Sequence, residues 1–184
     1  MSQSLSLLQS VGVDVITSPT SFDILFEPTL QVVSTLRRFV LALYERILRD
    51  AGVSSQMALV THELLENAVK YNAADGASLR ICLLRQPGSG AGYVIEIRTR
   101  NTAAPEHIRI AERLIARVRD TEDPDLLYLE MIRSSAEQTE GSGSGSGLGF
   151  ARIRAETAMA IDVYTDGDQI EVIAHALVFP GDSP

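Results

Sequence analysis

The segment Glu63-Leu64-Leu65-Glu66-Asn67-Ala68-Val69-Lys70-Tyr71 completes a stretch with the periodicity of an amphipathic helix. At about 100° per residue, one arc of this helix is apolar and the opposite arc is polar. The apolar arc comprises Met57, Val60, Leu64, Leu65, Ala68, Val69 and Tyr71, and the polar arc comprises His62, Glu63, Glu66, Asn67 and Lys70. Glu63 and Asn67 are four residues apart, so their side chains project together. A carboxylate beside a carboxamide can orient a water and hold a hard cation such as Mg²⁺, and a solvated polar face is the alternative.

A second informative segment is the glycine–serine run Gly141–Gly149, which leads directly into an apolar helical pattern from Phe150. Glycine allows a close backbone approach and positive φ angles. A helix that begins after such a loop presents free N–H groups and a positive dipole end to a phosphate. Glycine–serine repeats are also typical of flexible linkers, so the run alone leaves both interpretations open.

Together the two segments resemble conserved boxes of the GHKL (histidine kinase-like) ATPases, which include histidine kinases, type II topoisomerase ATPase domains and anti-sigma-factor kinases. Residues 63–71 resemble the N box, and Gly145-Ser146-Gly147-Leu148-Gly149-Phe150 resembles the G2 box. The resemblance extends over about residues 20–180 and is closest in style to the stand-alone anti-sigma-factor serine kinases. It implies a Bergerat fold, in which helices cover one face of a mixed, largely antiparallel sheet.

The resemblance also implies ATP and Mg²⁺ as cofactors, with a role for each matched residue. Asn67 would ligate the metal on ATP, and Glu63 would be the catalytic residue that acts on the attacking hydroxyl. Lys70, the only lysine in the chain, would lie near the phosphates, although a lysine placed for the helix dipole is a reasonable alternative. The phosphate loop, residues 141–149, would enclose the triphosphate with Gly145, Gly147, Leu148 and Gly149.

Between the two boxes the family carries Asp-x-Gly-x-Gly, whose aspartate recognises the adenine amino group. Here Asn101 takes the place of the aspartate, and Ala103 and Pro105 stand near the glycine positions. An asparagine oxygen still accepts a hydrogen bond but loses the charge-assisted part, and the added Cβ atoms narrow the adenine slot. Weakened, altered or lost nucleotide binding are all compatible with this change.

The order of elements predicts an α+β domain. Strands are expected at Phe22–Phe26, Ala77–Leu84, Gly92–Thr99, Ala160–Thr165 and Gln169–Val178, and helices at about residues 28–50, 54–71, 105–118, 124–132 and 148–159. Strands that meet through tight turns favour an antiparallel or mixed sheet with helices on one face. Ser54 or Ser55 is expected to cap the second helix. Residues 102–140 correspond to the family's lid, which would either contact a partner or simply cover the end of the sheet.

Composition narrows the class of protein. The 184 residues suit one domain, residues 1–184, and 45% of them are hydrophobic. The net charge of −8 argues against a nucleic-acid partner, and the arginines at 109–119 and 152–154 are expected on solvated helix faces. Cys82 is the only cysteine and is expected as a small buried hydrophobe. The sequence shows neither a signal peptide nor an apolar run of membrane-spanning length, so a cytoplasmic protein without a membrane partner is expected.

The three histidines add no separate site. His107 is expected at the surface where a helix starts and His175 on a strand, neither with a metal role. Thr61-His62-Glu63-Leu64 looks superficially like the phospho-acceptor box of sensor histidine kinases. We interpret this as coincidence, because the N box uses the same residues.

Three functions compete at this stage. The first is an ATP-dependent kinase that phosphorylates a Ser or Thr of a small partner of the anti-anti-sigma type, possibly as a homodimer. The second is a degenerate GHKL module without turnover that regulates partners by protein contact alone. The third is the ATPase part of a larger sensor kinase. Nucleotide binding and phosphotransfer, rather than any further sequence feature, discriminate between the first two.

Overall fold

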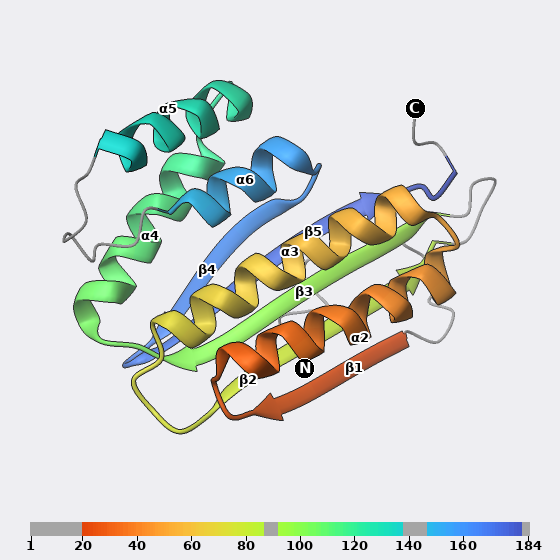
Figure 1. The fold of residues 1–184 in the computed structure, drawn as a ribbon, viewed down its shortest axis with the longest axis horizontal. Coiled ribbons are helices and arrows are strands. Elements are labelled where there is room, and N and C mark those ends of the chain that lie inside the picture. The colour runs from red at the N-terminus through yellow and green to blue at the C-terminus, as the bar shows by residue number, and fades with distance from the viewer. Residues whose placement is uncertain (1–19, 87–91, 138–146, 182–184) are drawn as a thin grey trace.

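The computed structural model describes residues 20–86, 92–137 and 147–181, which form one open sheet with helices on a single face (Figure 1). The elements are β1 (Thr20–Phe26), α2 (Leu30–Leu48), α3 (Ala51–Lys70), β2 (Ala77–Arg85), β3 (Tyr93–Thr102), α4 (Pro105–Arg119), α5 (Pro124–Glu137), α6 (Leu148–Glu156), β4 (Ala160–Asp166) and β5 (Gln169–Val178). The five strands lie in the order β1-β2-β3-β5-β4, and each neighbouring pair is antiparallel. The predicted α+β class is confirmed, and the described sheet is antiparallel throughout.

Alternation along the strands explains why only one face is covered. In β3, Ile95, Ile97 and Thr99 are buried under the helices, whereas the intervening side chains point to the other face. Ile97 lies between Ile81 of β2 and Ala174 of β5 in the register, and all three are buried. The core is therefore a sandwich of aliphatic side chains between sheet and helices.

The opposite face of the sheet carries ion pairs across the strands, beside apolar residues such as Leu84 and Ile173. Arg98 lies 2.9 Å from Glu96 and 2.9 Å from Glu171. His175 Nε2 lies 3.0 Å from Asp162 Oδ2 of the neighbouring strand. His175 is thus the strand residue that the sequence predicts.

Cys82 corrects one expectation. It lies on this opposite face, beside Glu96 in the register, and is half-buried rather than part of the core. Partial burial, and then the nearby Glu96 charge, raise the pKa of its thiol. A raised pKa leaves less thiolate at neutral pH, so the side chain remains poorly nucleophilic.

Helices α2 and α3 form the central part of the helical layer and share a buried polar contact. The Tyr44 side chain is fully buried, and its hydroxyl lies 3.1 Å from Thr61 Oγ1. Thr61 in turn donates to the carbonyl of Met57 at 2.8 Å, which leaves its oxygen as the acceptor for Tyr44. Burial raises the pKa of Tyr44 well above its usual range. This contact fixes α3 at Thr61, two residues before Glu63.

Three helix boundaries differ from the predicted ones, and one of them is the end of α5, which continues to Glu137 instead of ending near residue 132. The N-cap of α3 is Asp50, whose Oδ1 accepts from Val53 N at 2.9 Å, while Ser54 lies buried inside the helix. The chain passes from α2 to α3 in one tight step, because Arg49 takes a left-handed conformation with φ of 56°. At the other boundary, α6 ends at Glu156, since Thr157 is extended and caps it. No helix in the described part of the chain is both long and apolar enough to cross a membrane.

Asp50 gives a pH-dependent prediction. Its carboxylate accepts from Val53 N and from Gly181 N, and the hydrogen bond from Val53, followed by that from Gly181, lowers its pKa. A group whose folded pKa is depressed stabilises the fold above its unfolded pKa of about 4 and loses that contribution as the pH falls through the folded pKa. We therefore expect the melting temperature of Asp50→Ala to lie below that of the wild type at pH 6–7, and the gap to narrow as the pH falls below the unfolded pKa of about 4.

The matched control is the cap of α2. Thr29 accepts from Val32 N through a hydroxyl that does not titrate in this range. The gap between the wild type and Thr29→Ala should accordingly be independent of pH. A gap for Asp50→Ala that stays constant from pH 7 to pH 2.5 would contradict the assignment.

Candidate functional site

Two adjoining hollows lie between α3, α4, α6 and the sheet. The first has a cavity volume of about 40 Å³, opens partly to solvent and is mainly apolar. Its lining includes Leu64 and Ala68 of α3, Thr99 and Asn101 of β3, Leu114 of α4 and Phe150 of α6. The second has a cavity volume of about 270 Å³, is also partly open, and is polar, with Glu63, Glu66, Lys70, Tyr128, Gly149 and Arg152 in its lining. Asn67, Tyr71 and Gly147 line both, so the two hollows form one continuous cleft.

Helix α3 supplies the polar wall as its periodicity predicts. Glu63, Asn67 and Lys70 all line the polar hollow, and the Glu63 side chain is only 13% exposed. Lys70 is exposed at the rim, and its Nζ lies 5.2 Å from the centre of the Tyr71 ring. The structure therefore brings these three predicted residues together at one site.

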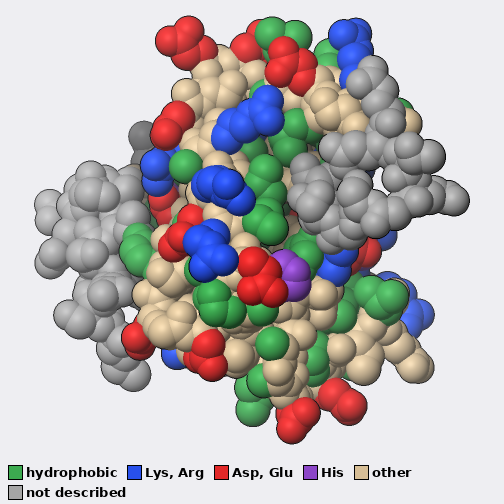
Figure 2. All heavy atoms as spheres, turned by 90° about the vertical axis from the view of Figure 1, so that its left-hand side faces the viewer, with side chains coloured by type: hydrophobic (Ala, Val, Ile, Leu, Met, Phe, Trp, Pro, Cys, Tyr) green, Lys and Arg blue, Asp and Glu red, His purple; other side chains and the backbone are tan. Residues whose placement is uncertain are grey.

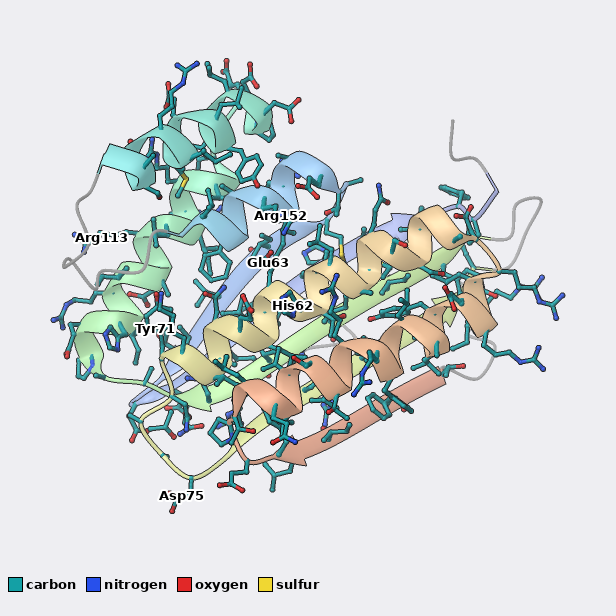
Figure 3. The ribbon with its side chains drawn as sticks, viewed as in Figure 1. His62, Glu63, Tyr71, Asp75, Arg113 and Arg152 are labelled. Atoms are coloured by element: carbon teal, nitrogen blue, oxygen red, sulfur yellow. The ribbon has the colours of Figure 1, made fainter. Side chains whose placement is uncertain are left out.

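Arg152 is the principal residue that the sequence analysis missed. It was expected on a solvated helix face, yet its Nη1 lies 3.1 Å from Glu63 Oε1, between α6 and α3 (Figure 3). Its Nε also binds Glu156 at 2.9 Å. The hydrogen bond to Glu156, and then the charges of both carboxylates, raise the pKa of the guanidinium. A signal did exist, because Arg152 lies three residues after Gly149 and so shares its side of the helix.

Glycines at the start of α6 allow this close packing. A Cβ on Gly149 would lie 2.6 Å from Glu63 Oε2, so the helix backbone lies against the carboxylate. Gly147 has φ of 64°, and a Cβ there would lie 2.7 Å from both methyl carbons of Leu114. Leu148 lines the polar hollow between them. Gly145, the remaining predicted loop residue, lies outside the described residues.

Gly147 gives a second prediction. Gly147→Ala should lower the free energy of unfolding by about 1–2 kcal/mol, because alanine is strained in the left-handed conformation. It should also displace Leu114 of α4, which adds to that cost. Urea denaturation of the purified variant measures the sum.

Gly167 provides the control, since it has nearly the same φ, 62°, with nothing within 4 Å of its Cβ position. Gly167→Ala should thus show the conformational cost alone. In a Leu114→Ala background, the added Gly147→Ala should cost no more free energy than Gly167→Ala costs in the wild type. If Gly147→Ala and Gly167→Ala lower the free energy of unfolding equally, the contact with Leu114 contributes nothing to the cost.

Asn101 lines the apolar hollow, and its side chain is buried, with 6% of the residue's surface exposed. Its Nδ2 donates to the carbonyl of Thr102 at 3.1 Å, which orients the amide and leaves Oδ1 as an acceptor. Within the described part of the chain, Oδ1 has no hydrogen-bond partner. Ala103 also lines this hollow, whereas Pro105 is exposed at the first turn of α4. Of the two residues expected to narrow the slot, Ala103 alone is in a position to do so.

His107 corrects another expectation. It is half-buried rather than on the surface, and its ring centre lies 5.1 Å from that of Tyr71. Both rings line the apolar hollow, where the end of α3 meets the start of α4. The contact joins segments far apart in sequence, so local patterns could not predict it.

A metal would find few ligands here from the protein alone. Among the described residues, no group of three or more His, Cys, Asp or Glu side chains is arranged to hold an ion. Asn67 could thus serve only as one ligand among oxygens from a bound molecule or water.

Comparisons with known proteins support the fold and give no information on the chemistry of the site. No family model matches the sequence, and no curated protein matches it. Solved structures do match, among them a chain of the crystal structure of the SiaB-SiaC complex from Pseudomonas aeruginosa. The TM-score is 0.54 at 15% identity, and the match covers 95% of this chain and 97% of that chain. At this identity the likeness shows a shared fold over nearly the full length of both chains.

Proposed function

We propose that this chain is an ATP-binding regulator of the histidine kinase-like type that phosphorylates a Ser or Thr of a small protein partner. The proposal rests on one observation: Glu63 and Asn67 of α3 face Gly147 and Gly149 of α6 across a cleft that continues to Asn101. This is the arrangement that the resemblance to GHKL ATPases implies. The sequence of each box taken alone does not require the two boxes to be neighbours in space.

The cleft fits a purine nucleotide in two respects. The apolar lining of the first hollow suits the faces of a planar base, and Asn101 Oδ1 offers an acceptor for an amino group. The polar hollow lies at the N-terminal turn of α6, where backbone N–H groups and the helix dipole favour phosphate. A Cβ on Gly149 would fill the space beside Glu63, so the glycine keeps this approach open.

Each residue then has a role in phosphoryl transfer. Bound Mg·ATP would supply the phosphoryl group. Glu63 would orient the partner's hydroxyl and accept its proton, and Asn67 would hold the metal. Lys70 and Arg152 would add positive charge at the phosphate end. Most of the rate enhancement in such a site comes from positioning and electrostatics.

A protein partner is consistent with the structural match, since that chain belongs to a complex named SiaB-SiaC. We propose that the partner of the present chain is a small protein of the anti-anti-sigma type that presents its hydroxyl at the polar hollow. The open rim beside Lys70 and Glu66, both exposed, provides access to Glu63.

A non-enzymatic binding module is the second candidate, favoured by the Arg152–Glu63 ion pair. The pair occupies the carboxylate that a base would need free. Two further features favour the non-enzymatic candidate. Asn101 replaces an acidic residue, and Ala103 lines the slot where the family has a glycine.

One titration separates the two candidates. Calorimetry with ATP, ADP and GTP, each with Mg²⁺, should show saturable adenine-nucleotide binding if the kinase proposal holds. Transfer of labelled phosphate from ATP to a co-purified small protein would then identify the partner. No binding up to millimolar nucleotide would overturn the kinase proposal and leave regulation by protein contact alone.

A further inference from the structure

A third hollow lies at the end of the molecule away from the cleft. It has a cavity volume of about 540 Å³, is partly open to solvent and is polar. Its lining comes from the end of α2, the facing ends of β2 and β3, and the residues that follow β5. Figure 1 shows the end of α2 on the opposite side of the molecule from α4. Helix α3 starts beside this hollow and lines the cleft with its last turns, and its 20 residues span ~30 Å, so the two sites are separate.

Three arginines are among the described residues that line this hollow, and we call them the arginine cluster. Arg46 and Arg49 lie three residues apart at the end of α2, so they share one side of the helix. Arg85 is the last residue of β2 and lies directly opposite Tyr93 of β3. All three arginines are exposed, and no acidic residue in the described part of the chain belongs to the lining.

Arg85 departs from the pattern of its strand. Leu79, Ile81 and Leu83 occupy the alternate positions of β2 that face the helices, and all three are buried. Arg85 is the next position in this series, where the alternation calls for another apolar side chain. The arginine is therefore on the helix side of the sheet, toward the end of α2, and not on the opposite face that carries the ion pairs.

The arginine cluster has little negative charge beside it. Neither Arg46 nor Arg49 forms an ion pair with another described residue. The Asp50 carboxylate follows Arg49 in sequence, but it accepts hydrogen bonds from the backbone N–H groups of Val53 and Gly181 instead. The positive charge of these two side chains is therefore available to a ligand.

The end of α2 does not cancel this charge. The negative end of a helix dipole amounts to about half an elementary charge, against three whole charges on the arginines. The Tyr93 hydroxyl donates to the Ile47 carbonyl at 3.5 Å, which occupies one of the free acceptors of the last turn. A favourable dipole accounts for arginines at the end of α2, but it gives no reason for Arg85 on the strand.

Another part of the surface shows the contrast. Figure 2 shows the side of the molecule that contains α4 and α5, where basic and acidic side chains are intermingled. Arg117 and Glu130, 3.6 Å apart, are one such pair. The net charge of −8 repels anions from the molecule as a whole. A hollow lined by arginines without a described acidic residue is therefore a local reversal of the overall charge.

We infer that the arginine cluster binds a small molecule that carries a diphosphate group. A guanidinium group donates two parallel hydrogen bonds to one phosphate, so arginine suits such a ligand better than lysine does. Two phosphates carry roughly three negative charges at neutral pH, which matches the three arginines. The cavity volume also lies within the range of about 300–1,000 Å³ that is typical of small-molecule sites. The inference is independent of the proposed function, because none of the three arginines lines the cleft.

Pyrophosphate alone is the probe, titrated by calorimetry to about 10 mM in the presence of EDTA, so that no metal assists binding. We expect the full chain to bind pyrophosphate at least about tenfold more tightly than orthophosphate, which reaches only part of the arginine cluster. Arg46→Gln and Arg85→Gln should each weaken pyrophosphate binding by at least about tenfold, the scale of one lost hydrogen bond to a charged group. No saturable binding, or equal affinities for the two anions, would overturn the inference.

Two control variants locate the bound pyrophosphate. Arg38→Gln removes the same charge from an exposed position of α2 outside the hollow, so its affinity should stay within about twofold of the wild type. Asn67→Ala alters the cleft and should likewise leave pyrophosphate binding unchanged. Circular dichroism checks that each variant is folded. Equal losses for Arg38→Gln and Arg46→Gln would contradict a specific site. A loss in Asn67→Ala without one in Arg85→Gln would place the anion in the cleft, which overturns this inference and leaves the proposed function intact.

Discussion

Asn67→Ala is expected to weaken Mg·ATP binding roughly 100-fold, which is the usual scale for the loss of a group that fixes a bound metal. The physical reason is that Asn67 lines both halves of the cleft and would supply the protein oxygen to the ion. The loss should be smaller for ATP without Mg²⁺, because the amide then contributes only a hydrogen bond. Calorimetric titration of the two proteins, with and without Mg²⁺, measures both quantities.

Gln56→Ala is the matched control for this prediction. It removes an amide from the same helix, about 16 Å away along the axis. Gln56 Nε2 donates to the carbonyl of Glu156 at 3.3 Å and takes no part in lining the cleft. Its affinity for Mg·ATP should equal that of the wild type. Equal affinities for Asn67→Ala and Gln56→Ala would mean that Asn67 takes no part in binding Mg·ATP.

Glu63→Gln is expected to retain nucleotide binding and to lose phosphotransfer by about 10²–10⁴-fold, the range for removal of a general base. Glutamine keeps the size of the side chain and can still hydrogen-bond, but it does not accept the proton. Binding could even improve, since the ion pair with Arg152 is lost and the guanidinium becomes available to phosphate. Single-turnover transfer from labelled ATP separates this chemical step from binding.

Glu45→Gln makes the same chemical change on the exposed side of α2, away from the cleft. It should transfer phosphate at the wild-type rate. A Glu63→Gln protein that transfers as fast as Glu45→Gln would mean that Glu63 orients nothing and accepts no proton. If the wild type and both variants bind nucleotide but the wild type transfers no phosphate, the result supports the non-enzymatic candidate.

Periodicity predicted the architecture and one wall of the site because both are local properties. The spacing of Glu63 and Asn67 determined that they share a helix face, and alternation along β3 determined which side chains face the helices. The same alternation could have placed Cys82 correctly, since Ile81 and Leu83 on either side of it are the buried residues. Its position was misjudged because the run Leu79–Leu84 was treated as uniformly apolar.

The remaining features depend on contacts between distant segments. Arg152 and Glu63 are 89 residues apart in sequence, and only the packing of α6 on α3 brings them together. The Tyr71–His107 contact likewise requires α4 to turn back over the end of α3. For the α3 cap the sequence analysis predicted Ser54 or Ser55, and the structure instead has Asp50, which follows the tight left-handed step at Arg49.

The contact between Tyr71 and His107 offers a position at which movement of α4 can be followed by fluorescence. The chain contains five tyrosines and no tryptophan, so a tryptophan introduced at position 71 would be the sole fluorophore of its kind. Its indole would lie beside the imidazole at the junction of α3 and α4, so its emission would depend on that contact. Movement of α4 away from α3 would then be recorded as a change in intensity, without any attached dye, on the timescale of a stopped-flow experiment.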